Sequence, residues 1–245
     1  PNSTRTGRLD DAAQFQRPLP ALPGAPDAAK DFFRRRQCEK TAPAYVVELS
    51  DGVAWGHRTG GIFSTEGHFA PAFTHDPAGA SQHTVWTRLH LPAPRRLAGR
   101  TLYLVTPEAT DNFHHWLIDL LPRIGLVRRA GHDLAAFDHI IVNHSNRAYQ
   151  RSTLEHLGLP RERIIAATDA LLVQCDTLVV PSLKTNHQNL PPHDLAFLRE
   201  AFLDGATVSN RHRRLFLTRN DASFRRLRNE SELYPLLRSF DFEIF

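Results

Sequence analysis

Four polar residues follow one another at steps of three, four and four, the spacing of one helix face: Asn112, His115, Asp119 and Arg123. Residues three and four apart lie on the same side of a helix. A histidine one turn before an aspartate can act as a general base that its carboxylate orients. We therefore expect His115 and Asp119 to be catalytic, and Asn112 and Arg123 to contact an acceptor molecule.

Two other interpretations of this face stay open. A solvent-exposed face with an Asp119–Arg123 pair needs no function. His115 and Asp119 could instead hold a metal ion with His114, as in a metal-dependent hydrolase. The sequence has neither an H-E-x-x-H motif nor a cysteine pair, so we expect no metal site. Pro122 is expected to kink or end the helix.

A second group of residues is rich in arginine. The apolar run 214–218 predicts a strand that Arg219 follows directly, and Arg225 and Arg226 precede a helix expected from Asn229. Arginine forks bind phosphate oxygens in pairs, and a helix N-terminus attracts anions. The segment therefore predicts a diphosphate site, although it lacks the glycines of a P-loop. A solvated basic loop with Asn229 as an ordinary helix cap is the alternative.

A third candidate is the polar segment 181–192, which contains His187 and follows an expected strand at 179–180. Its position at the carboxyl end of a strand favours a binding loop that touches the acceptor. A polar loop without function is the alternative.

The elements that position these residues change in type along the chain. Residues 1–43 are rich in proline and predict a tail, and short β-type runs at 44–88, including 83–86, predict a small antiparallel region. From residue 97 onward, strand-type runs alternate with helical patterns. This alternation predicts an α/β fold, a parallel sheet with helices on both faces, which binds ligands beyond the carboxyl ends of its strands.

Composition excludes several classes of protein. The 245 residues are 41% hydrophobic and 23% charged, which argues against disorder and against a coiled coil. The net charge of +4 is weak evidence for nucleic-acid binding, and we expect none. No apolar run approaches the length of a membrane span. The two cysteines lie far apart and predict neither a disulfide framework nor a zinc motif.

Two segments together resemble the signatures of glycosyltransferase family 61. Residues 112–123 resemble its N-x-x-H-W-L-x-D-x-L-P-R helix, and residues 215–245 resemble a strand ending in arginine, followed by R-R-x-x-N-E and a helix. The family includes bacterial capsular polysaccharide biosynthesis proteins and eukaryotic xylosyl- and N-acetylglucosaminyltransferases. The resemblance covers the chain from about residue 97 to residue 245.

This resemblance implies a GT-B-like architecture of two Rossmann-like lobes. Residues 44–208 would form the acceptor-side lobe, after the tail 1–43, and residues 209–245 the first βα unit of the nucleotide-sugar lobe. The family continues into an H-G-A-type motif that this chain lacks, so we expect the second lobe to be incomplete and the chain to be truncated. The implied reaction is inverting transfer of a sugar from a nucleotide sugar, usually a UDP-sugar, to a saccharide hydroxyl.

The resemblance also implies roles for single residues. Arg219, Arg225 and Arg226 would neutralise the diphosphate leaving group. Asn229 and Glu230 would shape their loop, and Asp119 or His115 would take the acceptor proton.

The remaining implications concern partners and location. No cofactor or metal would be obligatory, and the partners would be the UDP-sugar donor and a saccharide acceptor. We expect polysaccharide biosynthesis in the cytoplasm, at the inner face of the cell membrane. A non-catalytic saccharide-binding module is the alternative function.

Overall fold

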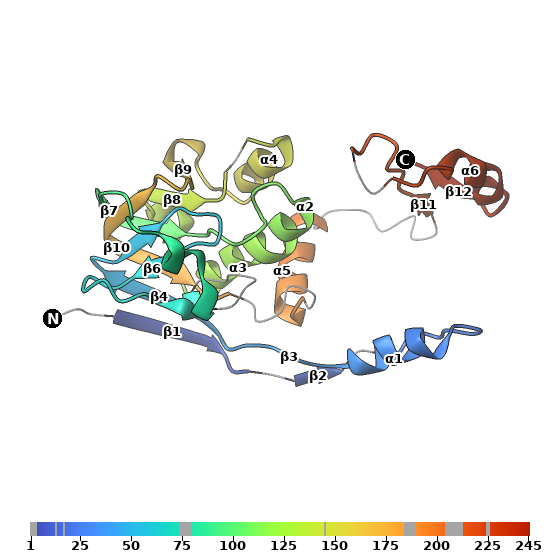
Figure 1. The fold of residues 1–245 in the computed structure, drawn as a ribbon, viewed down its shortest axis with the longest axis horizontal. Helices are drawn as coiled ribbons and strands as arrows, with labels where there is room; N and C mark the ends of the chain where they lie inside the picture. The colour runs from blue at the N-terminus through green and yellow to red at the C-terminus, as the bar shows by residue number, and fades with distance from the viewer. Residues whose placement is uncertain are drawn as a thin grey trace. The chain divides into compact units, whose positions relative to one another are not determined.

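A computed structural model describes residues 4–12, 14–16, 18–73, 80–144, 146–183, 190–203, 213–223 and 226–245. Internal contacts divide the chain into two compact units, Pro1–Phe202 and Leu203–Phe245 (Figure 1).

The first unit is built on an eight-stranded mixed sheet, whose main path runs β1-β4-β10-β7-β8-β9. The strands on this path are β1 (Thr4–Asp10), β4 (Ala44–Ser50), β10 (Leu172–Pro181), β7 (Arg95–Tyr103), β8 (His139–Val142) and β9 (Ile164–Ala166). The last four are mutually parallel, whereas β4 runs antiparallel to β10, and β1 antiparallel to β4. The predicted α/β class is confirmed, but the sheet is mixed rather than parallel.

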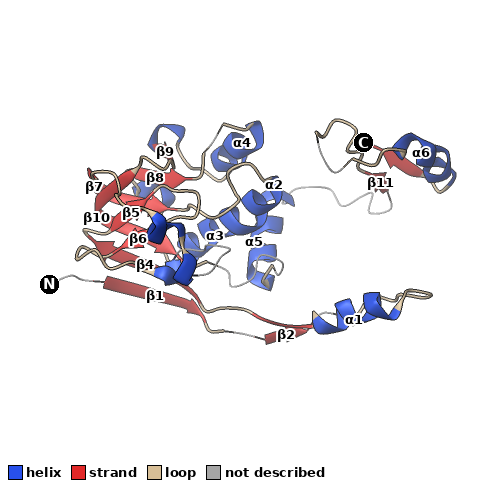
Figure 2. Cartoon of the chain, in the orientation of Figure 1, coloured by secondary structure: helices blue, strands red, loops and turns tan. Residues whose placement is uncertain are grey.

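Both faces of the central strands are buried, which explains their continuous apolar sequences. Leu102, Ile140 and Val179 belong to the core on one face. Three helices contribute to this core: α3 (Leu121–Arg129), α4 (Ala148–His156) and α5 (Pro192–Leu203) (Figure 2). The core on the other face includes side chains of β5 (Val53–Trp55) and β6 (Ile62–Phe63), which are strands of the same sheet, and of the 3₁₀ turn η1 (Pro71–Phe73). The expected helices on both faces are therefore a wrong prediction for the described residues.

The N-terminal segment contains more structure than a tail. Thr4–Asp10 pairs along β4 as an edge strand, and β2 (Gln14–Gln16) pairs with β3 (Cys38–Lys40) in a separate ribbon. Helix α1 (Asp27–Arg35) lies between β2 and β3 in sequence. The strand at the edge escapes sequence analysis because main-chain hydrogen bonds hold it, and Leu9 is its one apolar side chain.

The segment after the tail belongs to the main sheet rather than to a separate small region. Strand β5 pairs with β10 directly beyond β4, so 44–55 follows one antiparallel path along β10. The run 83–86 is not a strand, because Thr84–Thr87 forms the 3₁₀ turn η3, capped by the His83 side chain. The remaining short turns are η2 (Ala80–Gln82), η5 (Leu134–Ala136) and η6 (Arg161–Arg163).

The motif helix runs through Pro122 without ending. It consists of α2 (Phe113–His115), the π-helical turn η4 (Trp116–Leu120) and α3. In the π-turn, the Leu121 N–H bonds the Trp116 carbonyl. Proline has no N–H to offer a helix, and here it occupies the second position of α3, directly after the turn.

The second unit is a small βαβ arrangement. Strands β11 (Arg214–Phe216) and β12 (Phe242–Ile244) are parallel and are joined through α6 (Glu230–Ser239). Among its described residues after Leu203, the exposed large apolar side chains are Leu215, Leu217, Leu227, Leu236, Phe240 and Phe245. None of the helices in the described ranges of either unit has the length and apolarity needed to cross a membrane.

Candidate active site

The imidazole of His115 lies between two carboxylates. Its Nδ1 is 2.7 Å from Asp119 Oδ2, one helical turn further on, and its Nε2 is 2.6 Å from Glu108 Oε2. The structure thus brings the predicted pair, His115 and Asp119, together. A carboxylate can only accept hydrogen bonds, so each of these contacts requires a hydrogen on one of the two facing atoms.

Glu108 is the member of this cluster that sequence analysis missed. It lies in the loop that follows β7, with the left-handed backbone angle φ of 63°. The N–H of Ala109 bonds the carbonyl of Pro107 at 2.8 Å across it, which makes a three-residue γ-turn of the rare, strained kind. A charged residue just past the carboxyl end of a parallel strand was the available signal, because that edge binds ligands in such sheets.

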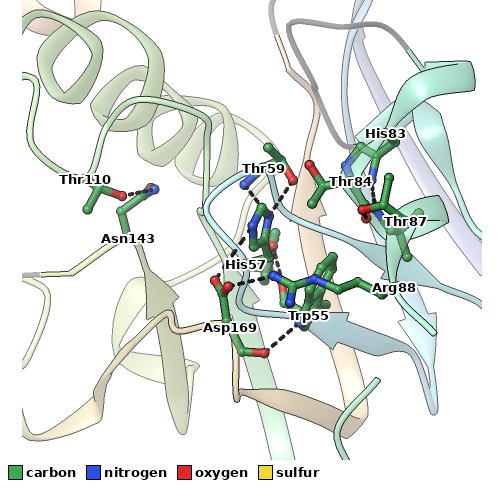
Figure 3. Close-up of polar contacts among 12 residues, drawn as sticks. Trp55, His57, Thr59, His83, Thr84, Thr87, Arg88, Thr110, Asn143 and Asp169 are labelled. Carbon is green, nitrogen blue, oxygen red and sulfur yellow. Dashed lines mark hydrogen bonds and ion pairs between the residues drawn. The ribbon is translucent and has the colours of Figure 1, made fainter. Parts of the chain in front are cut away.

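Two buried amide side chains fix the loop that carries Glu108. Asn143, directly after β8, donates to the Thr110 hydroxyl at 3.1 Å (Figure 3). It also accepts from the Thr106 N–H at 3.0 Å and donates to the Thr106 carbonyl at 2.7 Å. Gln150, in α4, donates to the Thr110 carbonyl at 2.9 Å. The loop is therefore held on both sides of Glu108 by groups that water does not reach.

Arg123 does not share the face of His115 and Asp119. Its side chain is 1% exposed and donates to the carbonyls of Val105 at 3.0 Å and Pro181 at 2.8 Å, with a longer contact of 3.3 Å to that of Tyr103. Burial lowers the pKa of Arg123 to about 10. The prediction that Arg123 contacts an acceptor is wrong, because the side chain ties the ends of β7 and β10 together inside the core.

Asn112 and His187 are the other two residues that were predicted to contact the acceptor. Asn112 is exposed, and its side-chain oxygen accepts from the His114 N–H at 3.0 Å, so it caps the start of the motif helix. His187 lies outside the described residues, as does Arg225.

In the second unit, Glu230 orders the loop that begins with Arg219. The Glu230 side chain is buried, and its carboxylate accepts from the hydroxyls of Thr218 and Tyr234 and, at 3.4 Å, from the Arg219 N–H. The hydrogen bond from Thr218 lowers the pKa of Glu230. The Glu230 carboxylate is thus buried against the start of the loop and does not face a ligand.

The positive charge of this loop comes from side chains rather than from the helix end. Arg219 and Arg226 are both exposed. The first turn of α6 contains Glu230 and Glu232, and Asn229 makes no side-chain cap but donates its amide to Glu232 at 3.2 Å. Two acidic residues disfavour an anion at that helix N-terminus, so the contribution of the helix end stays a prediction that these charges oppose.

The buried His57 has contacts that hold the fold together. His57 stacks on Trp55, with ring centroids 4.6 Å apart, and its Nδ1 accepts from the Thr59 N–H at 3.2 Å (Figure 3). Trp55 also donates to the Asp169 carbonyl at 2.9 Å, and Arg88 bonds the Asp169 carboxylate at 2.8 Å. Burial lowers the pKa of His57. These contacts tie the loop before β10 to β5.

Within the described ranges, no group of three or more His, Cys, Asp or Glu side chains is arranged to hold a metal ion. His114, the third ligand of the metal interpretation, is exposed, and its ring packs edge-on against that of His115.

The geometry therefore combines an α/β sheet, a carboxylate–imidazole–carboxylate cluster at the carboxyl end of a central strand, and a separate arginine-rich loop. The family model described as Glycosyltransferase 61 matches residues 113–245, more than half of the chain. The chain belongs to glycosyltransferase family 61 and is a glycosyltransferase. Neither the search of curated proteins nor that of solved structures found a match.

Proposed function

We propose that the protein transfers a sugar from a nucleotide sugar, most simply a UDP-sugar, to a hydroxyl of a saccharide acceptor with inversion at the anomeric carbon. The observation that carries this proposal is the cluster around His115. A proton-accepting group in a hydrogen-bonded chain is what activation of an acceptor hydroxyl requires. The cluster lies at the carboxyl end of β7, where α/β sheets bind ligands.

The donor is proposed to bind the second unit through arginine side chains. Arg219 and Arg226 are both exposed, and the buried Glu230 carboxylate accepts a hydrogen bond from the Arg219 N–H. Guanidinium groups placed at a diphosphate stabilise the charge that develops as the leaving group departs. This electrostatic role requires no metal ion and no cofactor. Arg225 keeps its predicted role in the same loop.

The wider context follows from the family. We propose a GT-B-like architecture, with which the mixed α/β sheet of the first unit is compatible, and a role in capsular or extracellular polysaccharide biosynthesis. A position at the inner face of the cell membrane stays a prediction.

Calorimetric titration of UDP tests the donor assignment, with GDP and CDP as comparators and EDTA present throughout. The longest open reading frame that contains this chain is the protein to use. UDP-selective binding should weaken about tenfold or more in R219A or R226A, because a hydrogen bond to a charged group contributes about 1.5–3 kcal/mol.

The matched control is R213A. Arg213 is exposed in the same unit and is paired with Glu243 at 2.5 and 2.7 Å, so its loss removes the same charge without touching the loop. Equal affinity in all three variants, or no nucleotide binding by the folded protein, would reject the donor site. Saccharide binding without nucleotide binding would favour the non-catalytic module instead.

A further inference from the structure

The His115 imidazole offers no open nitrogen to an acceptor hydroxyl. Both ring nitrogens already face carboxylate oxygens, at 2.6 Å on the Glu108 side and 2.7 Å on the Asp119 side. An incoming hydroxyl can reach His115 only by displacing one of these two carboxylates. It can reach Glu108 without displacing anything, because a carboxylate has two oxygens and accepts several hydrogen bonds.

Exposure orders the three groups from the interior to the solvent. The side chain of Asp119 is 6% exposed, that of His115 is 14% exposed, and that of Glu108 is 54% exposed. The buried Asp119 is therefore the innermost of the three contacting groups. The outermost group is the Glu108 carboxylate, on the loop after β7. A group that meets a sugar hydroxyl must be accessible to it, which Glu108 is.

The backbone supports a specific task for Glu108. A left-handed γ-turn is strained for any residue with a side chain, and such strain persists where the surroundings fix the conformation. Here Asn143 and Gln150, 1% and 0% exposed, bond the main chain on both sides of the turn. Their bonds go to Thr106, Ala109 and Thr110. The turn therefore keeps the Glu108 side chain at the Nε2 side of His115.

We propose that Glu108 is the catalytic base of the transfer and that His115 and Asp119 are positioning residues behind it. This inference rests on the proposed transferase function. The O–H bond of the acceptor breaks and its proton goes to the Glu108 carboxylate. The acceptor oxygen forms a bond to the anomeric carbon, and the bond from that carbon to the diphosphate oxygen breaks. The electron pair of the broken bond leaves with the nucleoside diphosphate.

The test measures acceptor-dependent release of UDP in wild type, E108Q, E108D and H115Q, with the UDP-sugar and saccharide found by a donor and acceptor screen. E108Q should lower kcat by about 10²–10⁴-fold, the usual contribution of a general base, with the donor KM unchanged. The rise of kcat/KM on the acidic side of the pH profile should flatten. E108D should recover part of the rate, since it restores a carboxylate.

If His115 positions Glu108, its substitution should lower the activity less than substitution of Glu108 itself. A glutamine amide at position 115 can still donate to Glu108, so H115Q should retain more activity than E108Q. The matched control is D111N: Asp111 is on the same loop, its side chain is 66% exposed, and it bonds Arg147 at 3.3 Å. D111N should retain the wild-type rate, and the urea unfolding midpoints of all variants should agree.

The outcomes separate the two proposals. An active wild type with E108Q within threefold of its kcat overturns the role of Glu108 and leaves the transferase standing. H115Q inactive beside an active E108Q would make His115 the base. Loss of activity in E108Q together with a lowered urea midpoint, and no recovery in E108D, would reduce Glu108 to a structural residue. A wild type that turns over no nucleotide sugar refutes the transferase, and the role of Glu108 with it.

Discussion

Replacing Arg123 by lysine isolates what the guanidinium fork contributes to the fold. Lysine also places a positive charge in the core, so the cost of burying a charge is kept, but a single ammonium cannot span three carbonyl oxygens. The two shorter bonds, at 2.8 and 3.0 Å, go to the last residue of β10 and to Val105, two residues past the end of β7. Each hydrogen bond to a charged group contributes about 1.5–3 kcal/mol.

Loss of one to two of these bonds should destabilise R123K by about 1.5–6 kcal/mol, a large part of the ~5–15 kcal/mol typical of a folded protein. For a chain of this size that corresponds to a fall in Tm of about 3–24 °C. Urea unfolding followed by far-UV circular dichroism measures the change. The control is R128K, since the exposed Arg128 makes one bond from the same helix, to the Leu157 carbonyl at 2.7 Å.

The reasoning would be refuted by R123K that unfolds at the wild-type urea concentration. A raised acceptor KM in such a stable variant would restore the original prediction that Arg123 contacts the acceptor. A lowered midpoint with an unchanged acceptor KM agrees with a purely structural role.

Three further predictions use the burial of single groups. Ellman's reagent at pH 8 should react quickly with the exposed Cys38 but not with Cys175 in the folded protein, because burial raises the pKa of Cys175 to about 11; two fast thiols would contradict the structure. N143A should lower stability by about 2–4 kcal/mol in urea, through loss of three hydrogen bonds that hold the Glu108 loop. Lowering the pH from 8 to 5 should reduce the free energy of unfolding of wild type relative to that of H57Q. The pKa of His57 is lowered in the folded protein, so the imidazole binds a proton in the unfolded chain at a higher pH than in the folded one. A difference in unfolding free energy that does not change with pH would show that His57 is not buried in its neutral form.

Strand positions were predictable where the sheet is buried on both faces. Strands were predicted at 101–105 and 138–142, and the structure has β8 at His139–Val142 and β7 at Arg95–Tyr103, which begins six residues earlier than predicted. The two runs at 171–173 and 177–180 were predicted separately, yet they form the single strand β10. Polar residues of that strand, Gln174 and Asp176, interrupt the apolar pattern, and Asp176 accepts from the Gly99 N–H at 2.9 Å across an irregularity in the ladder.

Contacts between residues far apart in sequence were not predictable in the same way. His115 and Asp119 could be paired from sequence because one helical turn separates them. Glu108 joins them only because the loop after β7 brings it to the start of the motif helix. That loop is held by the side chains of Asn143, directly after β8, and Gln150, in α4. No local pattern encodes a loop held by Asn143 and Gln150, so a base in that loop stays hidden until the sheet is assembled.

The misplacement of Arg123 has a single geometric origin in the π-turn at Trp116–Leu120. The predicted face assumed 3.6 residues per turn throughout, and each residue of an α-helix advances about 100° around the axis. A π-turn takes up one extra residue, so positions after it rotate by roughly that angle relative to positions before it. His115 lies before the turn and Asp119 within it, and they still meet. Arg123 lies after it and is carried into the core, beneath the strand ends that it joins. The same turn therefore divides a polar face that looked continuous into two parts: the paired His115 and Asp119, and the buried Arg123, which bonds the carbonyls at the strand ends.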